Sequence, residues 1–156
     1  MTQTLEPAAT ADRLKIYKVS PELYDAMMTL SNAAAKDLDP TIAELIKIRA
    51  SQLNRCAFCL DMHTHDARKN GETEQRLNLI AAWEEAGDLF TEQEQAALAL
   101  AEAVTDLSHG PVSDAVYARA AAAFTERELG QAISMAVTIN AWNRINAVVK
   151  AAPPRR

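Results

Sequence analysis

Apolar residues along this chain recur at spacings of three and four positions, and no stretch shows a sustained apolar–polar alternation. The first spacing is typical of helices with one buried face, whereas alternation is typical of half-buried strands. Alanine and leucine, both strong helix formers, are abundant, and Gly and Pro are few. The pattern therefore predicts an all-α protein, with helices over residues 20–37, 39–54, 56–70, 73–87, 91–110, 113–124 and 125–151.

Several of these helices carry start signals. A Ser-Pro pair at residues 20–21 and an Asp-Pro pair at 39–40 each place a capping residue before a proline at the first helical position. Thr91 and Thr125 each precede a glutamate by three positions, which is the spacing of a capping box. The helix over 39–54 is apolar on more than one face, so we expect it to be largely buried.

The length of 156 residues suits one domain, and 49% apolar residues are enough for a core. We expect an N-terminal arm over residues 1–19, one helical domain over 20–151 and a C-terminal tail over 152–156. Gly130 interrupts the last predicted helix, and close approach of a neighbouring helix would explain it. Three asparagines in that helix (Asn140, Asn143 and Asn146) would bond across a subunit contact or face water.

Charge and hydropathy exclude some functions. The net charge is −5 without a basic cluster, which disfavours nucleic-acid binding. No apolar run reaches the length of a membrane span, and the first fifteen residues lack the blocks of a secretory signal. We therefore expect a cytoplasmic protein. A close cysteine pair in that compartment is more often redox-active or metal-binding than structural.

The only two cysteines, Cys56 and Cys59, are followed by His63 on the same predicted helix. At roughly 100° per residue, these three side chains fall within an arc of about 60° on one helix face. His65 falls on the opposite face by the same reckoning. The spacing therefore selects His63 as the partner of the thiols.

This grouping suits thiol chemistry. The thiolate is the reactive form of cysteine, and a neighbouring imidazole can take up the proton or stabilise the anion. A second cysteine three residues away can capture a sulfenic acid as a disulfide. The residues thus predict a redox dithiol with an acid–base partner and without a bound cofactor.

Glu44, twelve residues before Cys56, completes a pattern with Cys56, Cys59 and His63 that resembles the alkylhydroperoxidase D-like family of the carboxymuconolactone decarboxylase superfamily. The strings Arg-Ala-Ser-Gln-Leu-Asn before the pair, Leu-Asp-Met-His-Thr after it and Asn-Ala-Trp-Asn-Arg at 140–144 are similar as well. The resemblance implies an alkylhydroperoxidase D-like helical bundle, present here as a single copy that assembles into trimers or hexamers. It also implies reduction of hydroperoxides.

In such a peroxidase Cys59 would attack the peroxide, Cys56 would resolve the intermediate, and Glu44 and His63 would relay protons. A dithiol reductant, such as a lipoyl-bearing protein, would reopen the disulfide. The chain departs from the family at Arg55, where many relatives have Gly, and at Phe58, where the well-studied peroxidase has a histidine. The true decarboxylases of the superfamily lack the cysteine pair, which argues against that reaction.

Physical reasoning alone leaves the cysteine roles open. A helix N-terminus favours the thiolate of Cys56, whereas proximity to His63 favours that of Cys59. We expect Cys59 to be the nucleophile. Burial should raise the pKa of Glu44 and make it a usable base near neutrality, unless a structural ion pair with Lys47 or Arg49 is its role.

Two further readings remain. Two cysteines and a histidine could hold zinc, but three ligands within two turns of one helix are tight for a tetrahedral site, so we expect no metal. A non-peroxidatic redox-sensing oligomer or a decarboxylase-like lyase would use the same residues differently.

Overall fold

The computed structural model describes residues 13–155, and every regular element in that range is helical, as predicted. The predicted arm falls largely on residues 1–12, which lie outside the described range. The α-helices are α1 (Ile16–Val19), α2 (Pro21–Ala35), α3 (Pro40–Leu53), α4 (Ala57–Lys69), α5 (Glu74–Leu79), α6 (Glu92–Thr105), α7 (Asp114–Ala123) and α8 (Glu126–Val149). A 3-10 helix, η1 (Ile80–Glu85), follows α5 directly.

Most of the predicted helix starts are confirmed, although Ser20 makes no capping hydrogen bond with its side chain at the start of α2. The Asp39 side chain accepts hydrogen bonds from the backbone N–H groups of Thr41 and Ile42 at the start of α3. Both capping boxes form, with Thr91 at the start of α6 and Thr125 at the start of α8. These contacts satisfy N–H groups that the first turn of a helix otherwise leaves without partners.

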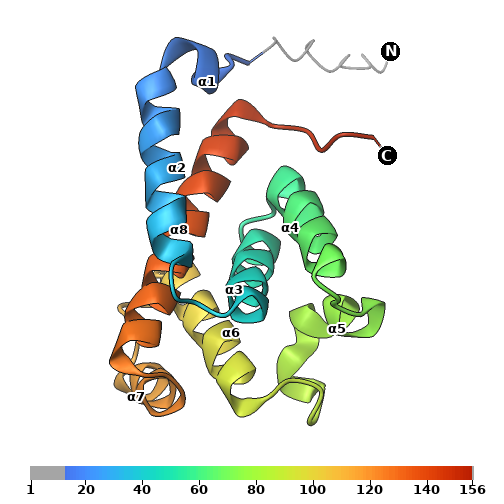
Figure 1. Cartoon of the computed structure of the whole chain (residues 1–156), viewed down its shortest axis with the longest axis vertical. Helices are drawn as coiled ribbons and strands as arrows, with labels where there is room; N and C mark the ends of the chain where they lie inside the picture. The colour runs from blue at the N-terminus through green and yellow to red at the C-terminus, as the bar shows by residue number, and fades with distance from the viewer. Residues whose placement is uncertain (1–12, 156) are drawn as a thin grey trace, which may run out of the picture.

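Helix α3 lies at the centre of the molecule and packs against α4, α6 and α8 (Figure 1). Ile42, Ala43 and Ile46 join a hydrophobic cluster that also contains residues of α2, α6 and α8. Leu45 and Ile48 join a second cluster with α4, α5, η1 and α6. The prediction that this helix is apolar on more than one face and largely buried is therefore confirmed. The core thus supports the segment that precedes the cysteines.

Two predicted helices are shorter than expected. The helix over 73–87 divides into α5 and η1, with a non-helical residue at Ala82. A 3-10 helix has three residues per turn, so it keeps the buried Ile80 and Trp83 on one face. The helix predicted over 91–110 ends at Thr105, so Leu107, which falls within the predicted range, lies outside the helix and is exposed.

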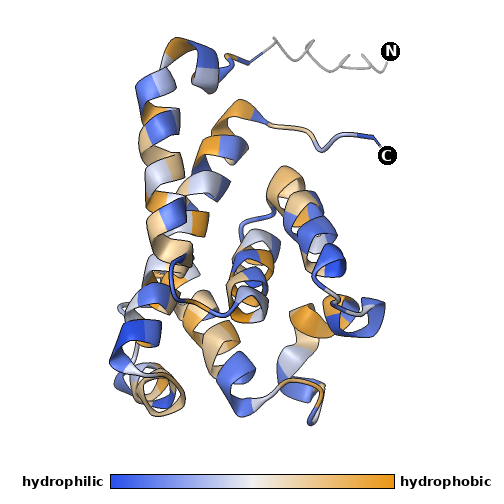
Figure 2. Cartoon of the chain, in the orientation of Figure 1, coloured by the Kyte–Doolittle hydropathy of each residue, from blue (hydrophilic) through white to orange (hydrophobic). Residues whose placement is uncertain are grey.

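Apolar side chains also remain on the surface of the single chain. Leu23 and Leu30 of α2 are exposed, as are Val19 and Val148. Figure 2 shows hydrophobic residues reaching the outer ends of α1 and α8. A side chain at Gly130 would meet nothing within 4 Å, so the expected close helix approach at this residue is wrong for the single chain. None of the helices in residues 13–155 has the length and apolar character of a membrane span.

Candidate redox site

The cysteines enter the structure through a tight turn between α3 and α4. Arg55 has a φ of 55°, in the left-handed region, and the backbone N–H of Cys56 donates to the Ser51 carbonyl at 3.0 Å. Cys56 is consequently the N-cap of α4, and the helix proper begins at Ala57. The predicted start at Cys56 is thus displaced by one residue, which leaves Cys56 at the positive end of the helix.

Asparagine side chains hold this turn against α8. The Asn54 amide donates to Asn140 Oδ1 at 2.8 Å and to Asn143 Oδ1 at 2.9 Å, and Asn143 Nδ2 donates to Ser51 Oγ at 3.1 Å. Asn140 and Asn143 are buried, so they neither face water nor need another subunit to bond. Buried polar groups that are fully paired make a packing arrangement specific, because leaving any one unpaired is costly. The network therefore fixes where the cysteine turn lies.

The two sulfur atoms lie at disulfide distance, with the Cα atoms 5.4 Å apart. Cys56 and Cys59 are 5% and 1% exposed, so both sulfurs are nearly excluded from solvent in the single chain. The Cys59 backbone N–H also points at Cys56 Sγ, at 3.4 Å. Such a donor at the first turn of a helix favours negative charge on the sulfur.

The structure brings the two other predicted residues, His63 and Glu44, into contact with each other. His63 lies one turn after Cys59 on α4 and is buried, and its Nδ1 atom is 3.3 Å from Glu44 Oε2 on α3. The orientation of the two groups does not meet the angular requirement of a hydrogen bond, so the contact is a close ion pair when the imidazole is protonated. The packing of α3 against α4 creates this meeting of carboxylate and imidazole.

Lys47 contacts the other oxygen of the Glu44 carboxylate, with Nζ 2.6 Å from Oε1. Burial raises the pKa of Glu44, but His63 and Lys47 together lower it by more, so the pKa lies below the ordinary value of 4.5. Our expectation of a raised pKa is therefore wrong. The carboxylate therefore stays ionised near neutrality, and its negative charge lies next to the imidazole of His63. Arg49, the other candidate partner, pairs with Glu102 on α6.

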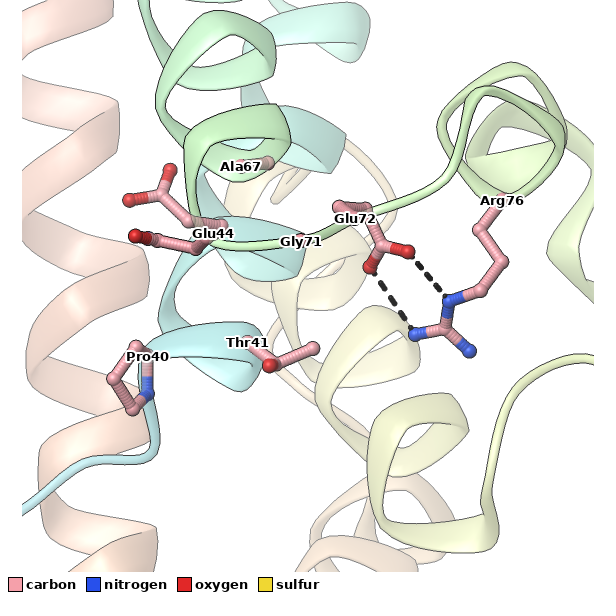
Figure 3. Close-up of a pocket in the computed structure, with 8 residues that line it drawn as sticks. Pro40, Thr41, Glu44, Ala67, Gly71, Glu72 and Arg76 are labelled. Atoms are coloured by element: carbon pink, nitrogen blue, oxygen red, sulfur yellow. Dashed lines mark hydrogen bonds and ion pairs between the residues drawn. The ribbon is translucent and has the colours of Figure 1, made fainter.

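A pocket of about 160 Å³ opens on the other side of Glu44. Pro40 and Thr41 of α3 and Gly71 after α4 belong to its wall, and Figure 3 shows the Glu72–Arg76 ion pair across from Glu44. Neither cysteine lines this pocket. Solvent therefore reaches the carboxylate by a route separate from the sulfurs.

Sequence reasoning missed one residue of the site. Asn146, in the last turn of α8, donates from Nδ2 to Cys59 Sγ at 3.2 Å. A signal was present, because three asparagines follow one another at a spacing of three residues along an otherwise apolar helix. Only the packing of α8 beside α4 shows that the last of them meets a sulfur.

The arrangement provides a dithiol that can cycle with a disulfide, and an imidazole that can exchange a proton beside it. Within residues 13–155, no group of three or more His, Cys, Asp or Glu side chains is arranged to hold a metal ion.

Known proteins resemble the chain along most of its length. The model of the carboxymuconolactone decarboxylase family matches residues 21–103, which include all four predicted site residues. The uncharacterized protein YdfG of Bacillus subtilis is 41% identical over 137 residues, which cover 87% of this chain and 92% of YdfG.

Solved structures also resemble this chain in fold. A protein of unknown function from Agrobacterium tumefaciens, named as a candidate antioxidant defence protein AhpD, is 36% identical with a TM-score of 0.88, over 93% of this chain and 99% of that one. An uncharacterized peroxidase-related protein from Ralstonia eutropha, with an alkylhydroperoxidase AhpD core, shares the fold at 19% identity. Its TM-score is 0.75, over 88% of this chain and 74% of that one.

The comparisons identify the family and the helical fold, and this chain carries a cysteine pair at disulfide distance within that fold. The chain belongs to the carboxymuconolactone decarboxylase family and has the fold of its AhpD-like members.

Proposed function

We propose that this protein is a thiol-dependent hydroperoxide reductase. The observation that carries the proposal is the cysteine pair at disulfide distance on α4, followed one turn later by a buried histidine that contacts Glu44. The combination supplies a nucleophile, a resolving thiol and a proton carrier in one place. The names of the Agrobacterium and Ralstonia proteins, which refer to antioxidant defence and to peroxidases, point in the same direction.

In the proposed reaction the Cys59 thiolate attacks the terminal oxygen of a hydroperoxide. The O–O bond breaks, the sulfur becomes a sulfenic acid, and the departing alkoxide takes a proton from His63. The Cys56 sulfur then loses its proton to the imidazole and attacks the sulfenic sulfur, which forms the disulfide and releases water. The Glu44 carboxylate stabilises the imidazolium whenever His63 carries the extra proton.

The cycle closes when an external dithiol reduces the disulfide. A thiolate of the reductant attacks one sulfur, the Cys56–Cys59 bond breaks, and the second thiol of the reductant releases the mixed disulfide. A lipoyl-bearing protein is the reductant we propose, with the cytoplasm as the compartment and a homo-oligomer as the working form. The exposed apolar residues of α1 and α2 are compatible with subunit contacts.

The proposal is tested by dithiol-driven consumption of hydrogen peroxide and of organic hydroperoxides, with dihydrolipoamide as reductant. We expect steady turnover by the wild type and none by Cys59→Ser or Cys56→Ser. Trapping with dimedone should detect a sulfenic acid in Cys56→Ser and none in Cys59→Ser. Serine suits the N-cap of α4, so Cys56→Ser preserves the helix start.

The opposite trapping pattern would reverse the two cysteine roles. Absence of turnover with every peroxide and dithiol would refute the reductase. If oxidation then changed the oligomer size without turnover, the redox-sensing alternative would replace it.

A further inference from the structure

We propose that Asn146 selects Cys59 as the sulfur that carries negative charge, by donating its side-chain N–H to Sγ. The inference deepens the proposed function, and it rests on that function only for the identity of the peroxide-attacking atom. Asn146 then belongs to the catalytic machinery, because its amide touches a reacting sulfur. The contact also distinguishes Cys59 from Cys56. The spacing of the two cysteines by itself does not show which of them carries the negative charge.

The contact itself is the first support. Asn146 Nδ2 lies 3.2 Å from Cys59 Sγ, and Cys59 is 1% exposed. A sulfur so enclosed has almost no water to stabilise its charge, so a fixed donor matters more than it would at the surface. Among residues 13–155, the hydrogen-bond donor to Cys56 Sγ is the backbone N–H of Cys59, at the longer distance of 3.4 Å.

The backbone on both sides of Asn146 is anchored, which holds the donor in place. Its carbonyl accepts hydrogen bonds from Lys150, whose φ of 51° ends α8, and from Ala151. One turn earlier, Asn143 is tied to Ser51 and Asn54 on the α3 side. A donor positioned in advance stabilises a charge without the cost of ordering it when the charge appears.

The amide differs in kind from the other groups near the sulfur. His63 on α4 is an imidazole that can gain or lose a proton. Glu44 and Lys47 on α3 form an ion pair, and the same carboxylate contacts the imidazole; on α8, Arg144 is bonded to Asn140. The Asn146 amide is neutral at every accessible pH and therefore supplies stabilisation that does not depend on the state of His63.

The test measures the acidity of each thiol separately. In reduced Cys56→Ser protein only Cys59 can react with iodoacetamide, and the pH dependence of that rate reports its pKa. Adding Asn146→Ala should move the midpoint up by about one pH unit, in line with a hydrogen bond to a charged group. Asn146→Asp should move it further, because a carboxylate also repels the thiolate. Asn78→Asp, the same change at an exposed position on α5, should not move it.

The reciprocal measurement uses reduced Cys59→Ser protein, in which Asn146→Ala should leave the Cys56 midpoint unchanged. An unmoved Cys59 midpoint in folded Asn146→Ala, or an equal shift for both cysteines, would overturn the assignment. If the alanine variant is unstable by circular dichroism, Asn146→Leu keeps similar volume without the donor and replaces it. No peroxide enters this assay, so a shifted midpoint in a protein without turnover would leave the inference standing while the reductase failed.

Discussion

Glu44 Oε2 lies 3.3 Å from His63 Nδ1, while the other oxygen of the same carboxylate lies 2.6 Å from Lys47 Nζ. One carboxylate thus contacts an ammonium group with one oxygen and an imidazole with the other. Glu44 also lines a pocket that neither cysteine lines, whereas both cysteines and His63 are buried. A carboxylate beside the imidazole stabilises its protonated form, which favours transfer of a proton to His63.

We expect Glu44→Gln to lower peroxide turnover by roughly tenfold to a hundredfold, near the lower end of general acid–base effects. Glutamine keeps the shape of the side chain but cannot stabilise an imidazolium. The measurement is steady-state turnover with dihydrolipoamide, together with the rate of sulfenic acid formation. Glu72→Gln, which changes a carboxylate across the same pocket, serves as the matched control. Equal losses in both variants would contradict a specific role for Glu44.

Stability should depend on Glu44 in acid. Its folded-state pKa lies below 4.5, so the unfolded chain binds the proton more readily and the carboxylate stabilises the fold above that pH. The contribution is lost as the pH falls through the lower, folded pKa. The difference in urea midpoint between wild type and Glu44→Gln should therefore be constant from about pH 7 to 5 and shrink below about 4.5.

Lys47→Met removes one of the groups that lower the Glu44 pKa. The Glu44 pKa in the folded state then moves closer to that of the unfolded chain, so less stability should be lost on acidification than in the wild type. An unchanged acid profile would show that the ammonium group does not control this carboxylate in solution.

Arg55→Gly should stabilise the protein by about 0.5–1 kcal/mol, because glycine adopts a φ of 55° without the steric cost that a Cβ imposes. Arg55→Val, with a branched Cβ, should destabilise by a similar amount or more. Chemical denaturation measures both. If Arg55→Gly were less stable than the wild type, contacts of the arginine side chain would contribute more to stability than the strain of its backbone costs.

Gly130→Ala should also stabilise, by about 0.5–1 kcal/mol, since the residue is helical and a Cβ there meets open space. Gly71→Ala is the contrasting variant: Gly71 has a φ of 95°, and its N–H and that of Glu72 close the end of α4 by bonding to Arg68 and Ala67. We expect that variant to be less stable. A concentration-dependent loss of stability in Gly130→Ala would reveal that another subunit covers this face.

The sequence predicted the helical class and most helix starts because capping residues and prolines act within a few positions of the residue they influence. Predicted helix ends were less accurate. Residues 73–87 do not form one helix, because Ile80 and Trp83 must pack against residues of α3 and α6 in the core. That packing is not visible in the sequence of the segment itself. Leu107 was misplaced for the same reason, since apolar spacing continues past the point where burial stops.

The chain by itself determined the pairing of Cys56 with Cys59 and their approach to His63, because all three are governed by the local geometry of one helix start. Tertiary structure alone decided what surrounds them. The low pKa of Glu44 needs His63 from a different helix, and the placement of the cysteine turn and the donor to Cys59 both come from α8, nearly ninety residues later. Electrostatic contacts and buried hydrogen bonds depend on distances in space, which packing sets and residue spacing does not.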